Sequence, residues 1–226
     1  MIDPDYPYHV ITKGNDDRPL VYDVRDRELF VLGLDQAATR HGWKVWSWCL
    51  MTNHFHLVVK TQESSLSRGM QELNGNHSRR VNRRHGRSGH LLRNRFFSAA
   101  VDSDAYAVSS NIYVVNNPVK AGLCTTPADW PWCSYRATVG LEQPPAWLAV
   151  DAVLGLFGRD RKKAIREYTD YVHSGHVPVS DTIERVSRFE PAPAEPAGGG
   201  GTARPGSGPA PRRAAAPSAP ATAPRG

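Results

Sequence analysis

The sequence, 226 residues long, has few cysteines and no long hydrophobic run. Its three cysteines are far apart and form no CxxC pair, which argues against a disulfide framework and against a structural zinc site. The longest apolar stretches fall well short of the roughly 20 residues that a membrane-spanning helix needs. We therefore expect no membrane partner, and we expect buried thiols at Cys49, Cys124 and Cys133.

The start of the sequence lacks the features of a secretory signal. The first residues, Met1-Ile2-Asp3-Pro4-Asp5, are acidic and include neither a basic start nor an apolar stretch. Together with the scarcity of cysteine, this predicts a cytoplasmic protein.

Aromatic and large aliphatic residues are missing from the last part of the sequence. From Pro191 onward, nine Pro and seven Gly occur within 36 residues, mixed mainly with Ala. Such a composition cannot bury enough apolar surface to offset the entropy of ordering the chain. We therefore predict a disordered tail over residues 189–226. A folded domain is expected over residues 1–188, with a core at about 6–140 and a C-terminal helical extension at about 145–176.

Acidic residues are missing from one long internal segment. Between Leu73 and Val101 there is no Asp or Glu, and the net charge of the whole chain is +6. The same segment contains seven arginines, which we call the arginine stripe: Arg79, Arg80, Arg83, Arg84, Arg87, Arg93 and Arg95. A basic stripe of this kind indicates a site for a polyanion, most commonly nucleic acid. The alternative is an exposed helix face that is simply solvated.

The body of the chain alternates between strand and helix patterns. We predict strands at Tyr8–Lys13, Trp43–Leu50, His54–Lys60 and Leu91–Val101. We predict helices from Asp23 to Gly42, from Ser65 into the arginine stripe, from Ser103 to Pro118, and over Arg161–Ser174. Pro118 is expected to end the third helix, because a residue that precedes proline is pushed out of the helical region.

The strand at residues 54–60 carries two histidines two positions apart. Side chains at this spacing point the same way and lie about 6.6 Å apart along the strand. His54 and His56 thus place two imidazoles side by side, which is a suitable geometry for one divalent cation. Two hydrogen-bonded, partly buried imidazoles without a metal are the alternative, and a third ligand would help to decide.

The helix before Pro118 offers such a ligand. Tyr113 and Asn117 are one helical turn apart, so both side chains project from one face. Next to the histidines, the amide oxygen of Asn117 would complete a three-ligand site, and Tyr113 would lie close enough to attack a phosphodiester as a nucleophile. The alternative for Tyr113 is an amphipathic core residue.

Two segments resemble a known family. The run Met51-Thr52-Asn53-His54-Phe55-His56-Leu57-Val58 is similar to the histidine-hydrophobic-histidine (HUH) signature of IS200/IS605-type single-tyrosine transposases. The segment from Tyr113 through Asn117-Pro118-Val119-Lys120 to Leu123 resembles the branch known as REP-associated tyrosine transposases. The resemblance covers roughly residues 6–175, in the family's order. It departs from the family's pattern at three positions, none of them catalytic: Thr52, His77 and Cys133.

The resemblance implies an α+β fold, a ferredoxin-like antiparallel sheet with helices on one face and the histidines on a central strand. It also implies a Mg²⁺ or Mn²⁺ ion with His54 and His56 as ligands, and it aligns Asn117 with the position of the third ligand. The implied activity is cleavage of single-stranded DNA at hairpin-forming repeats. Tyr113 would become joined to the 5′ phosphate and leave a free 3′ hydroxyl.

Two other functions stay open at this point. A DNA-binding protein that has kept the fold but no longer cuts would need none of the four residues His54, His56, Tyr113 and Asn117. A replication initiator or relaxase would use the same chemistry, but the short chain has no nucleoside-triphosphate motif and places the tyrosine after the histidines. The expected partner is single-stranded or hairpin DNA, bound by the arginine stripe, and the protein is expected as a monomer or a homodimer.

Overall fold

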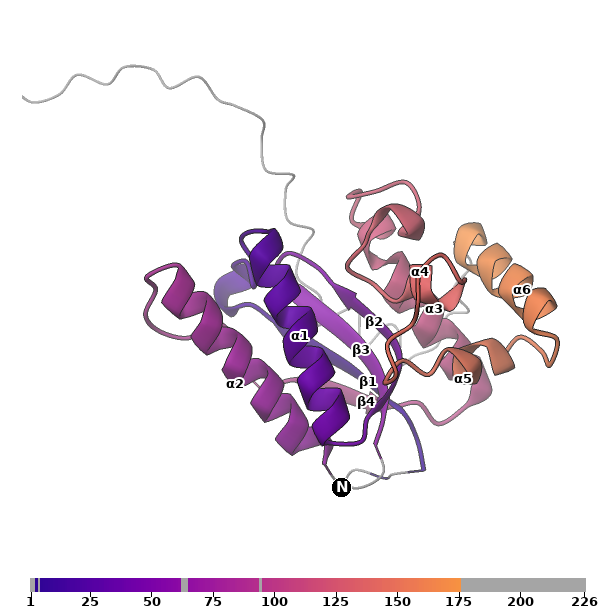
Figure 1. Ribbon diagram of the computed structural model, residues 1–226, viewed down its shortest axis with the longest axis horizontal. Coiled ribbons are helices and arrows are strands. Elements are labelled where there is room, and N and C mark those ends of the chain that lie inside the picture. Colours follow the sequence, from indigo (N-terminus) through magenta and orange to yellow (C-terminus); the bar gives the residue numbers. More distant parts are fainter. Residues whose placement is uncertain (1–2, 4, 62–64, 94, 176–226) are drawn as a thin grey trace, which may run out of the picture. The chain divides into compact units, whose positions relative to one another are not determined.

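The computed structural model describes residues 3, 5–61, 65–93 and 95–175 (Figure 1). The predicted tail at residues 189–226 lies outside these described residues. Among the helices described, none is long and apolar enough to cross a membrane. Cys49 and Cys133 are buried and form no disulfide, as predicted, whereas Cys124 forms no disulfide and is half-buried.

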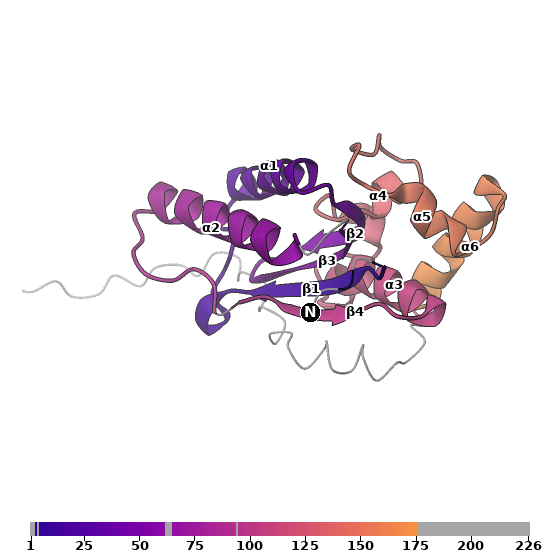
Figure 2. The ribbon, with the colours of Figure 1, turned by 90° about the horizontal axis from the view of Figure 1, so that it is seen from below.

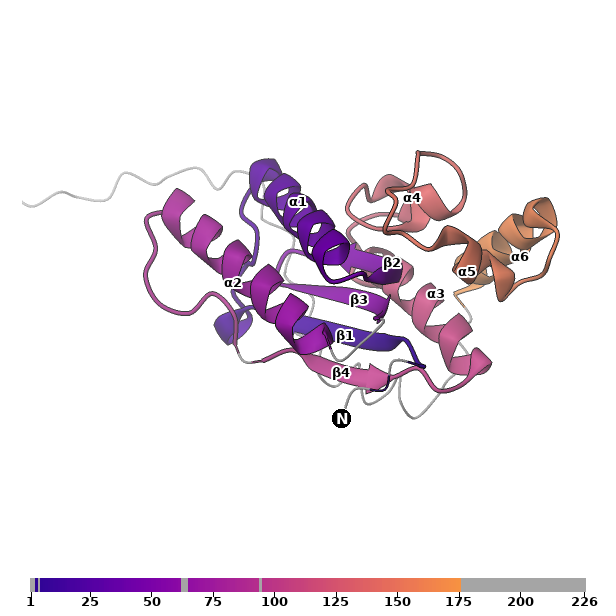
Figure 3. The same ribbon diagram turned by 60° about the horizontal axis from the view of Figure 1, so that its bottom comes forward.

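The centre of the fold is a four-stranded antiparallel sheet (Figure 3). Its strands are β1 (Tyr8–Lys13), β2 (Lys44–Leu50), β3 (His54–Lys60) and β4 (Phe97–Ala100). The spatial order is β2-β3-β1-β4, and every neighbouring pair is antiparallel. With one helix between β1 and β2 and another between β3 and β4, this is the ferredoxin-like arrangement. The predicted fold class is therefore confirmed.

Two helices cover one face of the sheet, α1 (Val24–Arg40) and α2 (Leu66–Arg84), and Figure 2 shows them side by side. Asp23 begins α1 by accepting a hydrogen bond from the backbone N–H of Asp26, 2.8 Å away. The alternation of β3 directs Phe55 to this face, where its ring lies 4.7 Å from that of Phe30. The apolar half of β3 is thereby buried against the helices.

The third long helix, α3 (Asp104–Lys120), lies against the opposite face of the sheet, because its Asn117 contacts histidine side chains of β3 that point away from α1 and α2. Ser103 caps α3 by accepting from the N–H of Tyr106, 3.3 Å away. The expectation that Pro118 ends the helix is wrong. Pro118 removes only its own N–H, and the chain stays helical to Lys120, where the N–H of Ala121 closes the last turn on the carbonyl of Asn117 at 3.0 Å.

The part of the chain after α3 packs beside α3 and β2. It contains the 3₁₀ turn Pro127–Asp129, α4 (Tyr135–Thr138), α5 (Val150–Gly155) and α6 (Arg161–Ser174), and another 3₁₀ turn lies at Asn15–Asp17. The bounds of α6 are those predicted. By contrast, the predicted strand at residues 91–101 is shorter in the structure. Among the described residues of this segment, only β4 is paired as a strand, and Leu92 makes an isolated bridge to Gly14.

Candidate active site

His54 and His56 lie on β3, a central strand, on the face that α3 covers. Both are buried, with 5% and 0% of their surfaces exposed. Their ring centres are 5.0 Å apart and the rings are nearly perpendicular. The period of the strand thus places the imidazoles side by side, as the sequence predicts.

Asn117 lies between the two imidazoles. Its Oδ1 is 3.2 Å from Nε2 of His54, and its Nδ2 is 3.3 Å from Nε2 of His56. The three residues predicted as metal ligands are therefore brought together, although they come from a strand and from a helix about 60 residues later in the chain. In both imidazoles it is Nε2 that faces the amide.

Tyr113 lies one helical turn before Asn117 and is buried, with 3% of its surface exposed. Its ring centre is 5.9 Å from that of His56 and 6.0 Å from that of His9. The ammonium of Lys120, in the last turn of α3, lies 3.9 Å from the centre of the Tyr113 ring. The phenol thus lies beside the histidines with a cation against its ring.

Two further residues contact the outer nitrogens of the imidazoles, and no sequence motif marks either of them as functional. Nε2 of His9 is 3.2 Å from Nδ1 of His56, and Oδ1 of Asn53 is 2.9 Å from Nδ1 of His54. Asn53 is adjacent to the histidine motif, but adjacency does not reveal its contact. His9 belongs to β1, and only the pairing of β1 with β3 brings it to His56.

Asn53 also decides which nitrogen of His54 carries a proton. Its Nδ2 donates to the backbone oxygen of Asp17 at 3.3 Å, so its Oδ1 accepts from Nδ1 of His54. In a neutral imidazole, Nε2 then presents a lone pair, and this lone pair faces Oδ1 of Asn117. Two acceptors at this distance repel each other unless a positive charge lies beside them. Two imidazole nitrogens and an amide oxygen therefore fit a divalent cation.

The comparisons with known proteins concern the family and the fold. The family model described as "Transposase IS200 like" matches residues 4–117, just over half of the chain. This chain belongs to the IS200-like transposase family. The match ends at Asn117 and so includes the two histidines and Tyr113.

A solved structure similar to this transposase is a REP-associated tyrosine transposase bound to a REP hairpin. The TM-score is 0.53 with 15% sequence identity, over 62% of this chain and 82% of that chain. At this identity the likeness concerns the fold. A search of the curated proteins finds no match.

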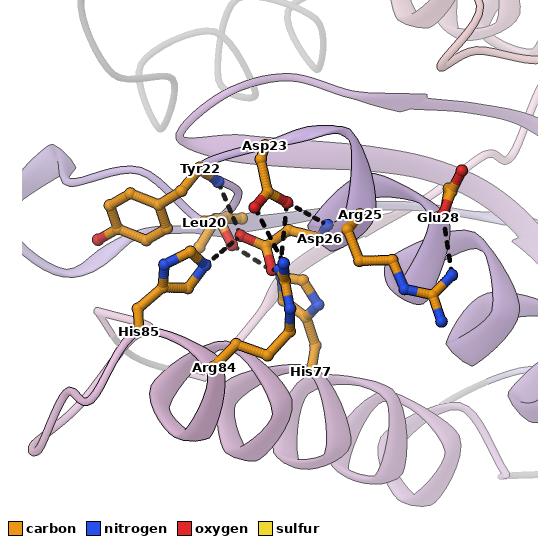
Figure 4. Close-up of polar contacts among 9 residues, drawn as sticks. All are labelled: Leu20, Tyr22, Asp23, Arg25, Asp26, Glu28, His77, Arg84 and His85. Carbon is orange, nitrogen blue, oxygen red and sulfur yellow. Dashed lines mark hydrogen bonds and ion pairs between the residues drawn. The ribbon is translucent and has the colours of Figure 1, made fainter.

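The transposase has a second cluster of possible ligand atoms, on the α1 and α2 side of the sheet (Figure 4). Asp23 and Asp26 begin α1, and His85 follows the end of α2. The guanidinium of Arg84 lies within this cluster, with ion pairs to Asp26 and, at 2.9 Å, to Asp23. We call Asp23, Asp26, Arg84 and His85 the α1–α2 clamp.

The clamp contains a fully buried carboxylate. Asp26 is 0% exposed and accepts hydrogen bonds from the backbone N–H of Tyr22 at 2.9 Å and from Nε2 of His85 at 2.8 Å, besides its ion pair with Arg84. The hydrogen bond from Arg84 is the main reason that the pKa of the Asp23 carboxyl is lowered to about 2, followed by that from the N–H of Asp26.

The arginine stripe is divided between internal contacts and exposed positions. Arg80 donates to the backbone oxygen of Leu29 at 3.1 Å, Arg84 belongs to the clamp, and the guanidinium of Arg87 lies over the ring of Tyr22. Arg79 bonds to Asn76 on its own helix. Arg79, Arg83, Arg93 and Arg95 are exposed, and Arg84 is partly exposed beside its ion pairs.

Arg93 and Arg95 line a groove of about 980 Å³ between α2 and residues 89–93 and 95–98. The α2 side of the groove presents small and amide side chains, namely Ser67, Gln71, Asn74, Gly75 and Ser78. On the other side of the groove, Phe96 follows Arg95 in the sequence, and its half-buried ring lines the groove together with the two arginines. Cationic, amide and aromatic groups are thus gathered in one depression.

Proposed function

We propose that this transposase binds, cleaves and rejoins single-stranded DNA at hairpin-forming repeats, through a covalent bond between Tyr113 and a 5′ phosphate. The observation that carries the proposal is the burial of a tyrosine beside two imidazoles and an amide whose ligand atoms converge. The family supports DNA strand transfer, and the REP hairpin in the similar structure supports a hairpin substrate.

In the proposed reaction, the oxygen of Tyr113 loses its proton and attacks phosphorus. The bond between phosphorus and this oxygen forms while the bond from phosphorus to the 3′ oxygen breaks, and the 3′ oxygen takes up a proton. Attack by a 3′ hydroxyl on the phosphotyrosine reverses these steps and rejoins DNA. The Lys120 ammonium, 3.9 Å from the ring centre, would stabilise negative charge on the phenol oxygen.

A Mg²⁺ or Mn²⁺ ion would be held by Nε2 of His54, Nε2 of His56 and Oδ1 of Asn117. When bound, it would polarise the scissile phosphate and neutralise its developing charge. Imidazoles and an amide form a weak site for such hard cations, so we expect appreciable affinity only when phosphate oxygens join the ligands.

The proposed DNA contacts are the exposed arginines of the stripe that lie outside the clamp. Arg93 and Arg95 lie in a groove whose amides can bond to base edges and whose Phe96 can stack on a base, which suits a single strand. Arg79 and Arg83 would contact phosphates along α2. Arg80, Arg84 and Arg87 were predicted for the same role, but their internal contacts favour a mainly structural one.

The proposal is tested by a search for the covalent adduct. The protein is incubated with Mn²⁺ and fluorescent hairpin-bearing single strands taken from its flanking genomic repeats, and it is then run on a denaturing protein gel. A fluorescent protein band is expected from the wild type and is expected to be missing in Tyr113→Phe, which keeps the ring but lacks the nucleophilic oxygen.

Tyr135→Phe is the matched control, because Tyr135 has the same exposed fraction as Tyr113, 3%, but packs against Tyr168 in the C-terminal extension. This variant should form the adduct. An adduct that persists in Tyr113→Phe would show that Tyr113 is not the nucleophile. Hairpin binding without any adduct in the wild type would favour a non-cleaving DNA-binding protein of the same fold.

A further inference from the structure

We propose that His9 and Asn53 are positioning residues that orient the two histidines for metal binding. Each holds the Nδ1 atom of one imidazole, His9 that of His56 and Asn53 that of His54. The proposal rests on the proposed metal site, and it assigns a role to residues outside the ligand set. Its central claim is that both Nε2 lone pairs are directed towards Asn117 by groups on the far side of the rings.

Asn53 is itself fixed by the backbone of the loop that follows β1. Its Nδ2 donates to the carbonyl of Asp17, and its own carbonyl accepts from the N–H of Gly14 at 2.8 Å. Gly14 cannot be replaced without a shift, because a Cβ there would lie 1.9 Å from the carbonyl oxygen of Arg18. The amide of Asn53 is therefore anchored, and its Oδ1 is directed at His54.

His9 reaches His56 across the sheet. In the register of β1 and β3, His9 lies opposite Val58 and is the diagonal neighbour of His56 on the same face. His9 is completely buried, and its Nδ1 lies 3.4 Å from the hydroxyl of Tyr106, in the first turn of α3. Both nitrogens of the His9 ring thus have a contact, one to β3 and one to α3.

One arrangement of protons makes the contacts of His56 consistent with metal binding. If Nδ1 of His56 donates to Nε2 of His9, then Nδ1 of His9 donates to the oxygen of Tyr106. Nε2 of His56 is then an acceptor, in agreement with the amide nitrogen of Asn117 at 3.3 Å. A metal ligand also needs this form, with its lone pair on Nε2 and its proton on Nδ1.

The two histidines are therefore held in the same way by different elements. A metal-binding histidine usually donates its other N–H to a partner that fixes its ring, and loss of that partner typically costs 10–100-fold in metal affinity. We expect a loss of about this size when His9 is replaced by Leu, which fills similar space but cannot accept a hydrogen bond.

The experiment measures Mn²⁺ affinity by electron paramagnetic resonance of the free ion, in the presence of the hairpin oligonucleotide and with Tyr113→Phe in every variant to prevent cleavage. His9→Leu should bind Mn²⁺ about 10–100-fold more weakly. His9→Gln should recover most of the affinity, because its amide oxygen can take the place of Nε2 as an acceptor. Unfolding by urea shows whether each variant is folded.

His77→Leu is the matched control. His77 is also a buried imidazole, but it lies on the opposite face, against Phe30, and its Nε2 contacts the carbonyl of Leu20 at 2.9 Å. The histidine that this variant loses is buried but does not contact the proposed metal site, so the Mn²⁺ affinity should be unchanged. A loss equal to that of His9→Leu would mean that general destabilisation explains both, and would overturn the proposal.

The remaining outcomes separate this proposal from the proposed metal site. If His56→Ala abolishes Mn²⁺ binding while folded His9→Leu binds as the wild type does, the metal site stands and the role of His9 is wrong. If the wild type binds no Mn²⁺, both are wrong. If His9→Leu does not fold, Asn53→Ala tests the same principle on His54, and unchanged affinity in that variant would overturn it.

Discussion

The active-site cluster and the α1–α2 clamp lie on opposite faces of one sheet and contain similar atoms, yet they differ in where their positive charge comes from. In the clamp, two carboxylates meet the guanidinium of Arg84, so the protein neutralises its own anions. In the candidate active site, His54, His56 and Asn117 are possible metal ligands that carry no formal negative charge, and their ligand atoms lie close together. The clamp is thus a complete structural contact, whereas the proposed metal site would take its positive charge from a bound cation.

The largest expected effect is the loss of cleavage when a ligand is removed from the active site. His56→Ala should show no detectable Mn²⁺-dependent cleavage of a hairpin oligonucleotide, because one imidazole, the amide of Asn117 and a phosphate oxygen would hold the ion too weakly. Affinity for DNA, measured by fluorescence anisotropy, should stay close to that of the wild type. Cleavage that continues in this variant, or in the wild type with excess chelator, would show that the site does not work through a metal.

The second expected effect is the opposite of the first: a change in the clamp should lower the stability of the fold but leave DNA cleavage intact. Asp26→Ala removes the buried acceptor of the Tyr22 N–H and should lower the free energy of unfolding by about 1–3 kcal/mol. Arg84 and His85 are partly exposed, so water can solvate them and moderate the loss. Urea unfolding measures the change, and the amount of adduct per folded molecule should be unaltered.

Asp26→Asn is the control for shape. It keeps an acceptor for the Tyr22 N–H and should cost less than Asp26→Ala. A clamp variant that is fully stable but cleaves no DNA would contradict the division of roles between the two clusters.

The sequence predicts the active-site cluster much better than it predicts the clamp. The spacing of His54 and His56 on a strand, and of Tyr113 and Asn117 on a helix, follows from local periods of two and about four residues. The resemblance then relates the two segments. For this reason the residues that touch one another across β3 and α3 are predictable, even though about 60 positions separate them.

Contacts that depend on strand register or on helix packing cannot be predicted from these local periods. His9 reaches His56 only because β1 pairs with β3 so that His9 lies opposite Val58. Arg84 resembles the other arginines of α2 in sequence, but the packing of α1 against α2 brings it to Asp23 and Asp26. The arginine stripe, which is defined by composition alone, therefore includes both structural arginines and candidate DNA contacts.

The third expected effect separates these two kinds of arginine. Replacing Arg93 and Arg95 with Gln should weaken DNA binding for every sequence and reduce the salt dependence. On a single strand, the slope of log K against log salt should fall by about 0.7 for each phosphate that the protein no longer neutralises. Arg80→Gln with Arg84→Gln is the matched pair and should change stability more than this slope. An unchanged slope in the first pair would show that those arginines are only solvated.

The smallest expected effect is a dependence of stability on pH that comes from the clamp. The pKa of Asp23 is lowered from 3.8 to about 2 in the folded protein, mainly by the hydrogen bond from Arg84. Because the folded pKa is the lower one, this carboxylate stabilises the fold fully above about pH 4, and its contribution is lost as the pH falls towards 2. The urea midpoint of the wild type should therefore fall more steeply over this range than that of Asp23→Asn, in which position 23 no longer titrates.

Asp23 is exposed to solvent, so the difference should be modest and should shrink in 1 M salt, where charges are screened beyond about 3 Å. Parallel midpoints for the two proteins from pH 4 to 2 would show that Arg84 stabilises α1 through Asp26 alone.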